Sequence, residues 1–171
     1  CLDDRQVAGV RGFVAGGGAG YFILTPPYGR RQEALVMKIG TSGSVDWQVL
    51  YEADPAKDCN NGISALVPTP DGGYLAVGSV GKSNPPESQV LVMKLGHDGS
   101  VRWLKAYSAG VDDYGVVVVA TNDSGFIIAA GTQWMDSSLD DVWVFKLNMA
   151  GDVVWQYAFA DRKSTPSELQ S

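Results

Sequence analysis

A pattern of about 50 residues occurs three times in this chain. Each copy contains a lysine followed by isoleucine or leucine, and a tryptophan nine positions after the lysine. Repeats of this length that are built from strand-like segments are typical of β arrays in which each unit packs against its neighbours. One unit cannot bury its apolar surface alone, so the repeat constrains the fold of the whole chain. The repeated pairs are Lys38 and Trp47, Lys94 and Trp103, and Lys146 and Trp155.

The second copy shows the unit most clearly. Turns are expected at Asp71–Gly73 and His97–Gly99, and a loop with two prolines is expected at Gly81–Ser88. No stretch of the chain keeps a helical period of apolar residues, so we expect the segments between the turns to be strands. We therefore predict an all-β fold made of four-stranded antiparallel units. The strands predicted in this copy are Ile63–Val67, Tyr74–Ser79, Val90–Leu95 and Val101–Tyr107.

The same order of segments recurs in the other two copies. We expect repeats over residues 9–51, 63–107 and 115–159, in a single domain, 1–171, that ends in a polar tail without a strand at 160–171. Runs such as Val116–Val119 and Val142–Phe145 are apolar at successive positions. Such runs predict strands that are covered on both faces, as in sheets stacked face to face.

The pattern Gly-x-Val-x-Trp occurs at Gly43–Trp47, Gly99–Trp103 and Gly151–Trp155. Together with the preceding Lys-Leu or Lys-Ile strand end, it resembles the tryptophan-docking repeat of PQQ-like β-propellers. The resemblance covers nearly the whole chain and implies a β-propeller-type array of three four-stranded blades. It also implies that Trp47, Trp103 and Trp155 are structural residues between blades. Such blades serve quinoprotein enzymes as well as scaffold lipoproteins, so the resemblance implies no single function.

Three blades are fewer than the four to eight of a closed propeller. Two apolar blade faces are therefore expected to remain open, and large apolar patches are rarely left in water. The chain is a piece of a larger propeller, or it pairs with a second copy of itself, or it docks on other protein subunits. In each case we expect a non-catalytic module for protein–protein interaction or structural support.

An enzymatic role, as part of a quinoprotein-like dehydrogenase, is the alternative. His97 is the only histidine in the sequence and lies in a predicted turn, so a catalytic triad or a zinc site would depend on it alone. Ala76–Ser83 matches a relaxed phosphate-binding loop, but no helix is expected after it. We therefore predict no catalytic residue, no cofactor and no metal.

The predicted loops between second and third strands hold the candidate partner contacts. Tyr28, Arg30, Arg31 and Trp134 lie there, and they are residue types that protein interfaces favour. Trp134 and Tyr28 would also suit a glycan-binding surface, which is a further alternative.

Aspartates gather in the connections that a propeller brings to one face. We expect ordinary solvated acids there, and calcium binding is the alternative because calcium takes oxygen ligands. These residues are Asp54, Asp58, Asp112, Asp113, Asp136, Asp140 and Asp141.

Charge and cysteine content limit the partners and the location. The net charge of −6 disfavours nucleic acid and anionic lipid. Two cysteines are too few for a disulfide scaffold, although a Cys1–Cys59 bridge is one alternative. Cys1 is a candidate lipid-attachment residue of an exported lipoprotein, and the other interpretation is that the numbering begins at a fragment. We expect an extracytoplasmic protein that contacts a membrane only indirectly, through a lipid on Cys1.

Overall fold

The computed structural model describes residues 13–16, 20–24, 34–51, 59–83, 86–110, 112–133, 141–159 and 167–168. Every regular element in this part of the chain is a strand, and the strands pair almost entirely antiparallel. The prediction of an all-β fold is confirmed. None of the described segments forms a helix of the length and apolarity needed to cross a membrane.

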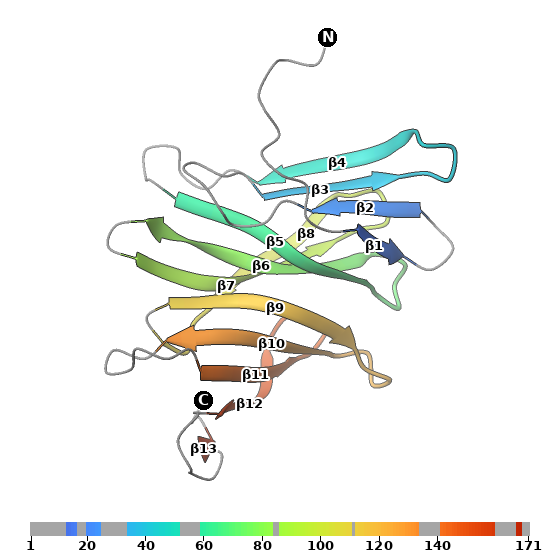
Figure 1. The fold of residues 1–171 in the computed structure, drawn as a ribbon. Coiled ribbons are helices and arrows are strands. Elements are labelled where there is room, and N and C mark those ends of the chain that lie inside the picture. Colours follow the sequence, from blue (N-terminus) through green and yellow to red (C-terminus); the bar gives the residue numbers. More distant parts are fainter. Residues whose placement is uncertain are drawn as a thin grey trace.

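The strands form three groups of four, each paired in chain order and stacked on the next group (Figure 1). Unit 1 consists of β1 (Phe13–Gly16), β2 (Gly20–Leu24), β3 (Ala34–Ile39) and β4 (Val45–Tyr51). Unit 2 consists of β5 (Cys59–Pro68), β6 (Tyr74–Ser83), β7 (Pro86–Leu95) and β8 (Val101–Tyr107). Unit 3 consists of β9 (Asp112–Ala120), β10 (Phe126–Gln133), β11 (Asp141–Leu147) and β12 (Val153–Phe159).

Units 2 and 3 meet at one parallel pairing between β7 and β9. Ser88 pairs with Asp112 across this junction, and the Ser88 hydroxyl donates a hydrogen bond to the Asp112 carboxylate. Asp112 was expected in a solvated loop, and the structure corrects this by placing it at the start of β9. The junction fixes how the two units stack at this end.

Two sequence expectations about strand limits are wrong. Gly81–Ser88 is not a loop throughout, because β6 and β7 stay paired up to Ser83 and Pro86. Pro86 is the first residue of its strand, where its missing N–H interrupts no inner part of the ladder. The tail is not free of strands either, since β13 (Ser167–Glu168) pairs with β12. The outer edge of β12 offers unpaired backbone groups to such a segment.

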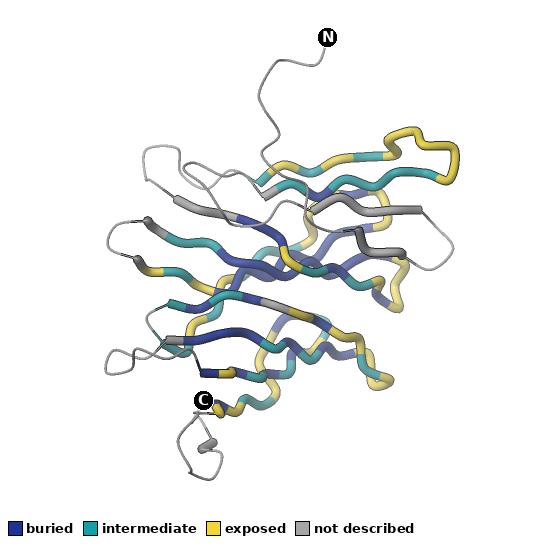
Figure 2. The backbone as a smooth tube through the Cα atoms, viewed as in Figure 1, coloured by how far each residue is buried: buried dark blue, intermediate teal, exposed yellow. Residues whose placement is uncertain are grey.

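Unit 2 is buried on both faces because its side chains alternate between two apolar cores (Figure 2). On β6, Tyr74 and Ala76 belong to the core shared with unit 1, whereas Leu75 and Val77 belong to the core shared with unit 3. The middle unit is therefore held by the packing of its two neighbours. Fully buried side chains such as Leu75 and Val77 each stabilise the fold by about 1.5–3 kcal/mol relative to exposure.

Candidate protein interaction face

The hairpin between the third and fourth strands has the same turn in every unit. The amide of the fourth turn residue donates to the carbonyl of the first, as Gly99 does to Gly96 at 3.1 Å and Gly151 does to Asn148 at 3.0 Å. The fourth residue has a positive φ of 84° at Gly43, 81° at Gly99 and 80° at Gly151. Glycine adopts this conformation without steric cost, which explains the glycine of the Gly-x-Val-x-Trp pattern.

Two of the repeated tryptophans dock on this turn of the following unit. The indole nitrogen of Trp47 donates to the carbonyl of His97 at 3.0 Å, and its ring covers Gly99 so closely that a β-carbon there would lie 2.7 Å away. Trp103 donates in the same way to the carbonyl of Met149 at 3.3 Å. The same contact is thus made at both junctions between units.

Further polar contacts join units 2 and 3 around Trp103. The Tyr107 hydroxyl donates to the carbonyl of Gly151 at 2.6 Å, and Lys105 forms an ion pair with Asp152 at 3.1 Å. Burial, followed by the nearby Asp152 charge, raises the pKa of Tyr107 well above its ordinary value. The hydroxyl therefore stays protonated and remains a donor.

Trp155 has the same position in unit 3, but no described turn follows it. Its ring packs beside Tyr157, with 5.6 Å between ring centroids, and its indole nitrogen is paired with no acceptor among the residues described. The strand register places apolar side chains of β9, β10 and β11 on the same face. We name this surface the tryptophan face of unit 3. It comprises Val117, Val119, Ile127, Ala129, Val142, Val144, Lys146, Trp155, Tyr157 and Phe159.

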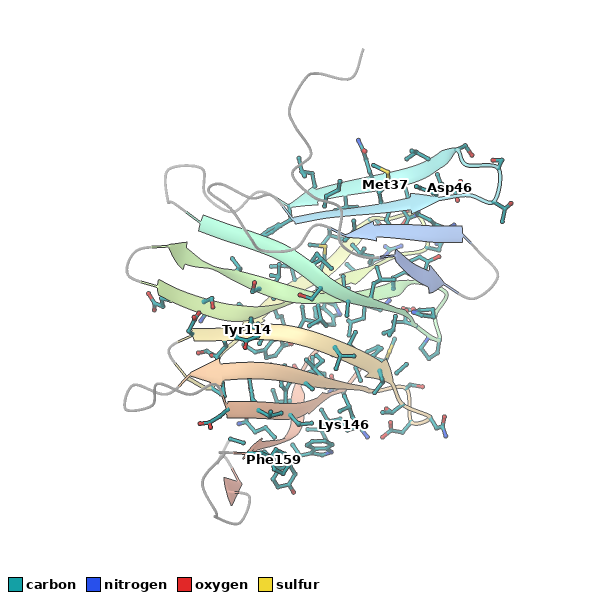
Figure 3. The ribbon with its side chains drawn as sticks, viewed as in Figure 1. Met37, Asp46, Tyr114, Lys146 and Phe159 are labelled. Atoms are coloured by element: carbon teal, nitrogen blue, oxygen red, sulfur yellow. The ribbon has the colours of Figure 1, made fainter. Side chains whose placement is uncertain are left out.

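The tryptophan face is exposed although the equivalent surface of unit 2 is buried. Val142 is 49% exposed, whereas Val90, which lies at the same position in unit 2, is 0% exposed. Figure 3 shows Lys146 and Phe159 at this end of the stack, away from Met37 at the unit 1 end. The expectation that Val116–Val119 and Val142–Phe145 are covered on both faces is therefore wrong within this chain, because no described segment packs on their outer side.

A buried lysine in unit 2 is paired with an aspartate, and the same pairing occurs in unit 3. Lys94 is only 3% exposed, and its ammonium group donates to Asp71 at 2.9 Å, to the Thr69 hydroxyl at 3.0 Å and to the Leu95 carbonyl at 3.2 Å. All three donors are satisfied, which burial of an ammonium group requires. Lys146 pairs with Asp123 at the equivalent place in unit 3. Because this lysine is already paired, the residues named above as the tryptophan face include no isolated charge.

Asp113 and Asp141 were expected as solvated loop residues, and the structure corrects this by burying both. The Asp113 carboxylate accepts hydrogen bonds from the amides of Ala109 at 2.9 Å and Gly110 at 3.1 Å, and from the Ser108 hydroxyl at 2.7 Å. It therefore closes the connection from unit 2 to unit 3. This role explains why an acid at the start of a strand is buried.

Several residues singled out from the sequence lie outside the described part of the chain or outside any candidate site. His97 is an exposed turn residue whose main-chain carbonyl, rather than its imidazole, receives Trp47. Among the described residues, no histidine, cysteine, aspartate or glutamate side chains form a group of three that could hold a metal ion. The residues outside the described ranges are Cys1, Tyr28, Arg30, Arg31, Asp54, Asp58, Trp134, Asp136 and Asp140.

Comparison of the sequence with models of known protein families and with curated proteins finds no match. We therefore base the proposed function on the geometry of the described residues. The repeat singled out the tryptophans from the sequence, but it did not identify the groups that accept their hydrogen bonds. Every residue has a main-chain carbonyl, so the sequence does not show which carbonyl is the acceptor.

Proposed function

We propose that this chain is a β-propeller-type module that acts, without catalysis, as a protein-binding or structural subunit of an extracytoplasmic assembly. The stacking of the units supports the propeller part of this proposal. The first strand of each following unit lies against the preceding unit, since β5 contacts β1, β2 and β3, and β9 contacts β5, β6 and β7. Radial repetition of four-stranded antiparallel sheets is the propeller arrangement.

The observation that carries the binding function is the exposed tryptophan face of unit 3. Its β12 strand presents Trp155, Tyr157 and Phe159 on one side, with Phe159 44% exposed. Protein interfaces are enriched in these aromatic residues, and tryptophan and tyrosine in particular dominate binding energies. The same chain covers the equivalent face of unit 2 with protein. A protein surface is therefore the kind of partner that suits this face.

A non-catalytic role is supported by the chemistry of the face. Among its described residues, Lys146 is the charged one, and it is paired with Asp123. The hydrogen bonds from Lys146, and then from Thr121, lower the pKa of Asp123 to about 2, which keeps this carboxylate ionised at neutral pH. A group poised for proton transfer would instead need a pKa near the working pH. The location outside the cytoplasm rests on the resemblance to exported propeller repeats.

The test is the native mass of the tagged full chain in extracts of its own source cells. We expect the chain in a particle heavier than its own 18.2 kDa. Val142→Glu places a charge on the tryptophan face and is expected to release the chain from the particle. Ala120→Glu is the matched control, because Ala120 is exposed and pairs with the buried Phe126, on the side of β9 opposite Val119. A chain that migrates at its own mass in all three forms would refute the binding function.

A further inference from the structure

The turn between β3 and β4 of unit 1 has the shape that receives a tryptophan in units 2 and 3, and Trp155 is a tryptophan that has no such turn among the described residues. Gly99 and Gly151 are each covered by a tryptophan of the preceding unit, whereas a β-carbon at Gly43 would meet no atom within 4 Å. Gly43 has the same positive φ, and its turn has the same hydrogen bonds. Among the described residues, the unit 1 turn is therefore covered by no tryptophan, and Trp155 of unit 3 docks on no turn.

The acceptor for such a tryptophan can be identified from the turn positions. Trp47 and Trp103 donate to the carbonyl of the second turn residue, which is His97 in one case and Met149 in the other. The second residue of the unit 1 turn is Thr41, which is exposed. Its carbonyl is the equivalent acceptor.

The apolar side of unit 1 matches the surface that receives Trp47 in unit 2. Met37 and Ile39 lie on the side of β3 opposite Val36, the buried β3 residue of the core shared with unit 2. Their equivalents Met93 and Leu95 are fully buried beneath unit 1, whereas Met37 and Ile39 are only half-buried. Unit 1 thus offers the same kind of apolar side chains beside its open turn.

The charges at the two ends also match. Lys105 in unit 2 faces Asp152 in unit 3. The position of Lys105 is occupied by Tyr157 in unit 3, and the position of Asp152 is occupied by Ser44 in unit 1. Both members of the ion pair are therefore replaced by uncharged residues at the two open ends. A contact between these ends would therefore bury neither member of this pair without its partner, and burial of an unpaired charge is expensive.

Building on the function proposed above, we propose that the partner on the tryptophan face is a second copy of this chain, bound head to tail. Trp155 of each copy packs on Gly43 of the other and donates to the carbonyl of Thr41. A head-to-tail contact forms a ring when its rotation closes. Two copies made of three units each close a six-unit ring, which lies within the range of known propellers.

The experiment measures the mass of the purified full chain by analytical ultracentrifugation over a range of concentrations. We expect a particle of twice the 18.2 kDa chain mass. Val142→Glu and Gly43→Ala are each expected to weaken dimerisation by about 100-fold, since each change occurs at both interfaces of the ring and a loss of about 1.4 kcal/mol per interface is tenfold. The substitution at Gly43 introduces only a β-carbon, at the point where the ring of Trp155 would lie.

Matched controls separate docking from folding. Gly72→Ala has the same backbone strain, because Gly72 has a φ of 80° and equally open surroundings, but it lies outside the docking turn. Ala120→Glu adds the same charge to β9 on the side opposite Val119. Both controls are expected to remain dimeric, and circular dichroism of every variant verifies the fold.

A mixture of the Val142→Glu and Gly43→Ala chains tests the direction of the contact. Each variant retains one intact end, so a head-to-tail contact gives a mixed dimer through one interface. A dimer that Gly43→Ala leaves intact would overturn the arrangement. A pure chain that is monomeric at every concentration would overturn the second copy as partner. If Val142→Glu still released that chain from its particle in extracts, the binding function would stand.

Discussion

The ring of Trp103 lies against Gly151 of the next unit, 2.9 Å from the place that a β-carbon would occupy. Trp47 and Gly99 have the same relationship one unit earlier. The glycine of the repeat therefore serves two needs at once, because it adopts a positive φ and also leaves room for the ring. A requirement that joins two units explains why the glycine and the tryptophan recur together.

A comparison of Gly99→Ala with Gly72→Ala should separate the need for a positive φ from the need for room beside the ring. The substitution at Gly99 strains the backbone and displaces Trp47, so we expect a loss of about 2–3 kcal/mol in the free energy of unfolding. Gly72→Ala, which strains a turn of the same φ without meeting a side chain, should cost only about 1 kcal/mol. Urea denaturation of both variants gives the comparison. Equal losses would show that the tryptophan contact contributes nothing to stability.

Ser124→Gly is expected to stabilise the chain by about 0.5 kcal/mol, because a residue with a β-carbon is strained at positive φ. Ser124 has a φ of 61°, whereas the other turns of this type have glycine at this position. The measurement is the midpoint of thermal unfolding, and Ser124→Ala is the control, which should give no gain. A lower midpoint for the glycine variant would contradict the presence of strain at this turn.

The sequence predicts the hairpins of this fold well because their signals are local. The bounds of β8 agree with the predicted Val101–Tyr107, since alternating apolar residues follow a glycine turn there. The start of β9 was missed, because Asp113 resembles a loop residue until its hydrogen bonds to Ala109 and Gly110 are known. Long-range contacts of this kind leave no local pattern.

The exposure of the tryptophan face could not be predicted from the local sequence either. Val90 and Val142 occupy equivalent positions in similar apolar runs, yet one is buried and the other is exposed. The difference is that unit 3 packs on Val90, whereas no described segment packs on Val142. A sequence pattern reports that a face is apolar, but the protein that covers it has to be found in three dimensions.

Asp113→Ala is expected to destabilise the chain by about 2 kcal/mol, because it leaves two partly buried amides without acceptors, at the lower end of about 1–3 kcal/mol each. The amides belong to Ala109 and Gly110 in the connection between units 2 and 3. Hydrogen exchange at these two amides should rise together with the loss of stability. Unchanged exchange in the variant would mean that the carboxylate does not hold the connection in place.

Stability should fall in acid through the ion pair of Asp71 with buried Lys94. Although partial burial opposes ionisation, hydrogen bonds from Thr69 and Lys94 lower the pKa of Asp71 to about 2 from 3.8. A lowered pKa in the folded state means that the stabilising effect is complete above about pH 4 and is lost as the pH falls toward 2. Because the Asp71 side chain is 50% exposed, screening by water limits the effect at pH 7 to about 1 kcal/mol.

Asp71→Asn removes this titrating group while keeping the size of the side chain. The free energy of unfolding of the variant should be lower than that of the wild type at pH 7, and the two values should converge as the pH approaches 2. Urea denaturation across this pH range measures the difference. A constant difference from pH 7 to pH 2 would show that the charge of Asp71 contributes nothing, since only the ionised carboxylate attracts the ammonium group of Lys94.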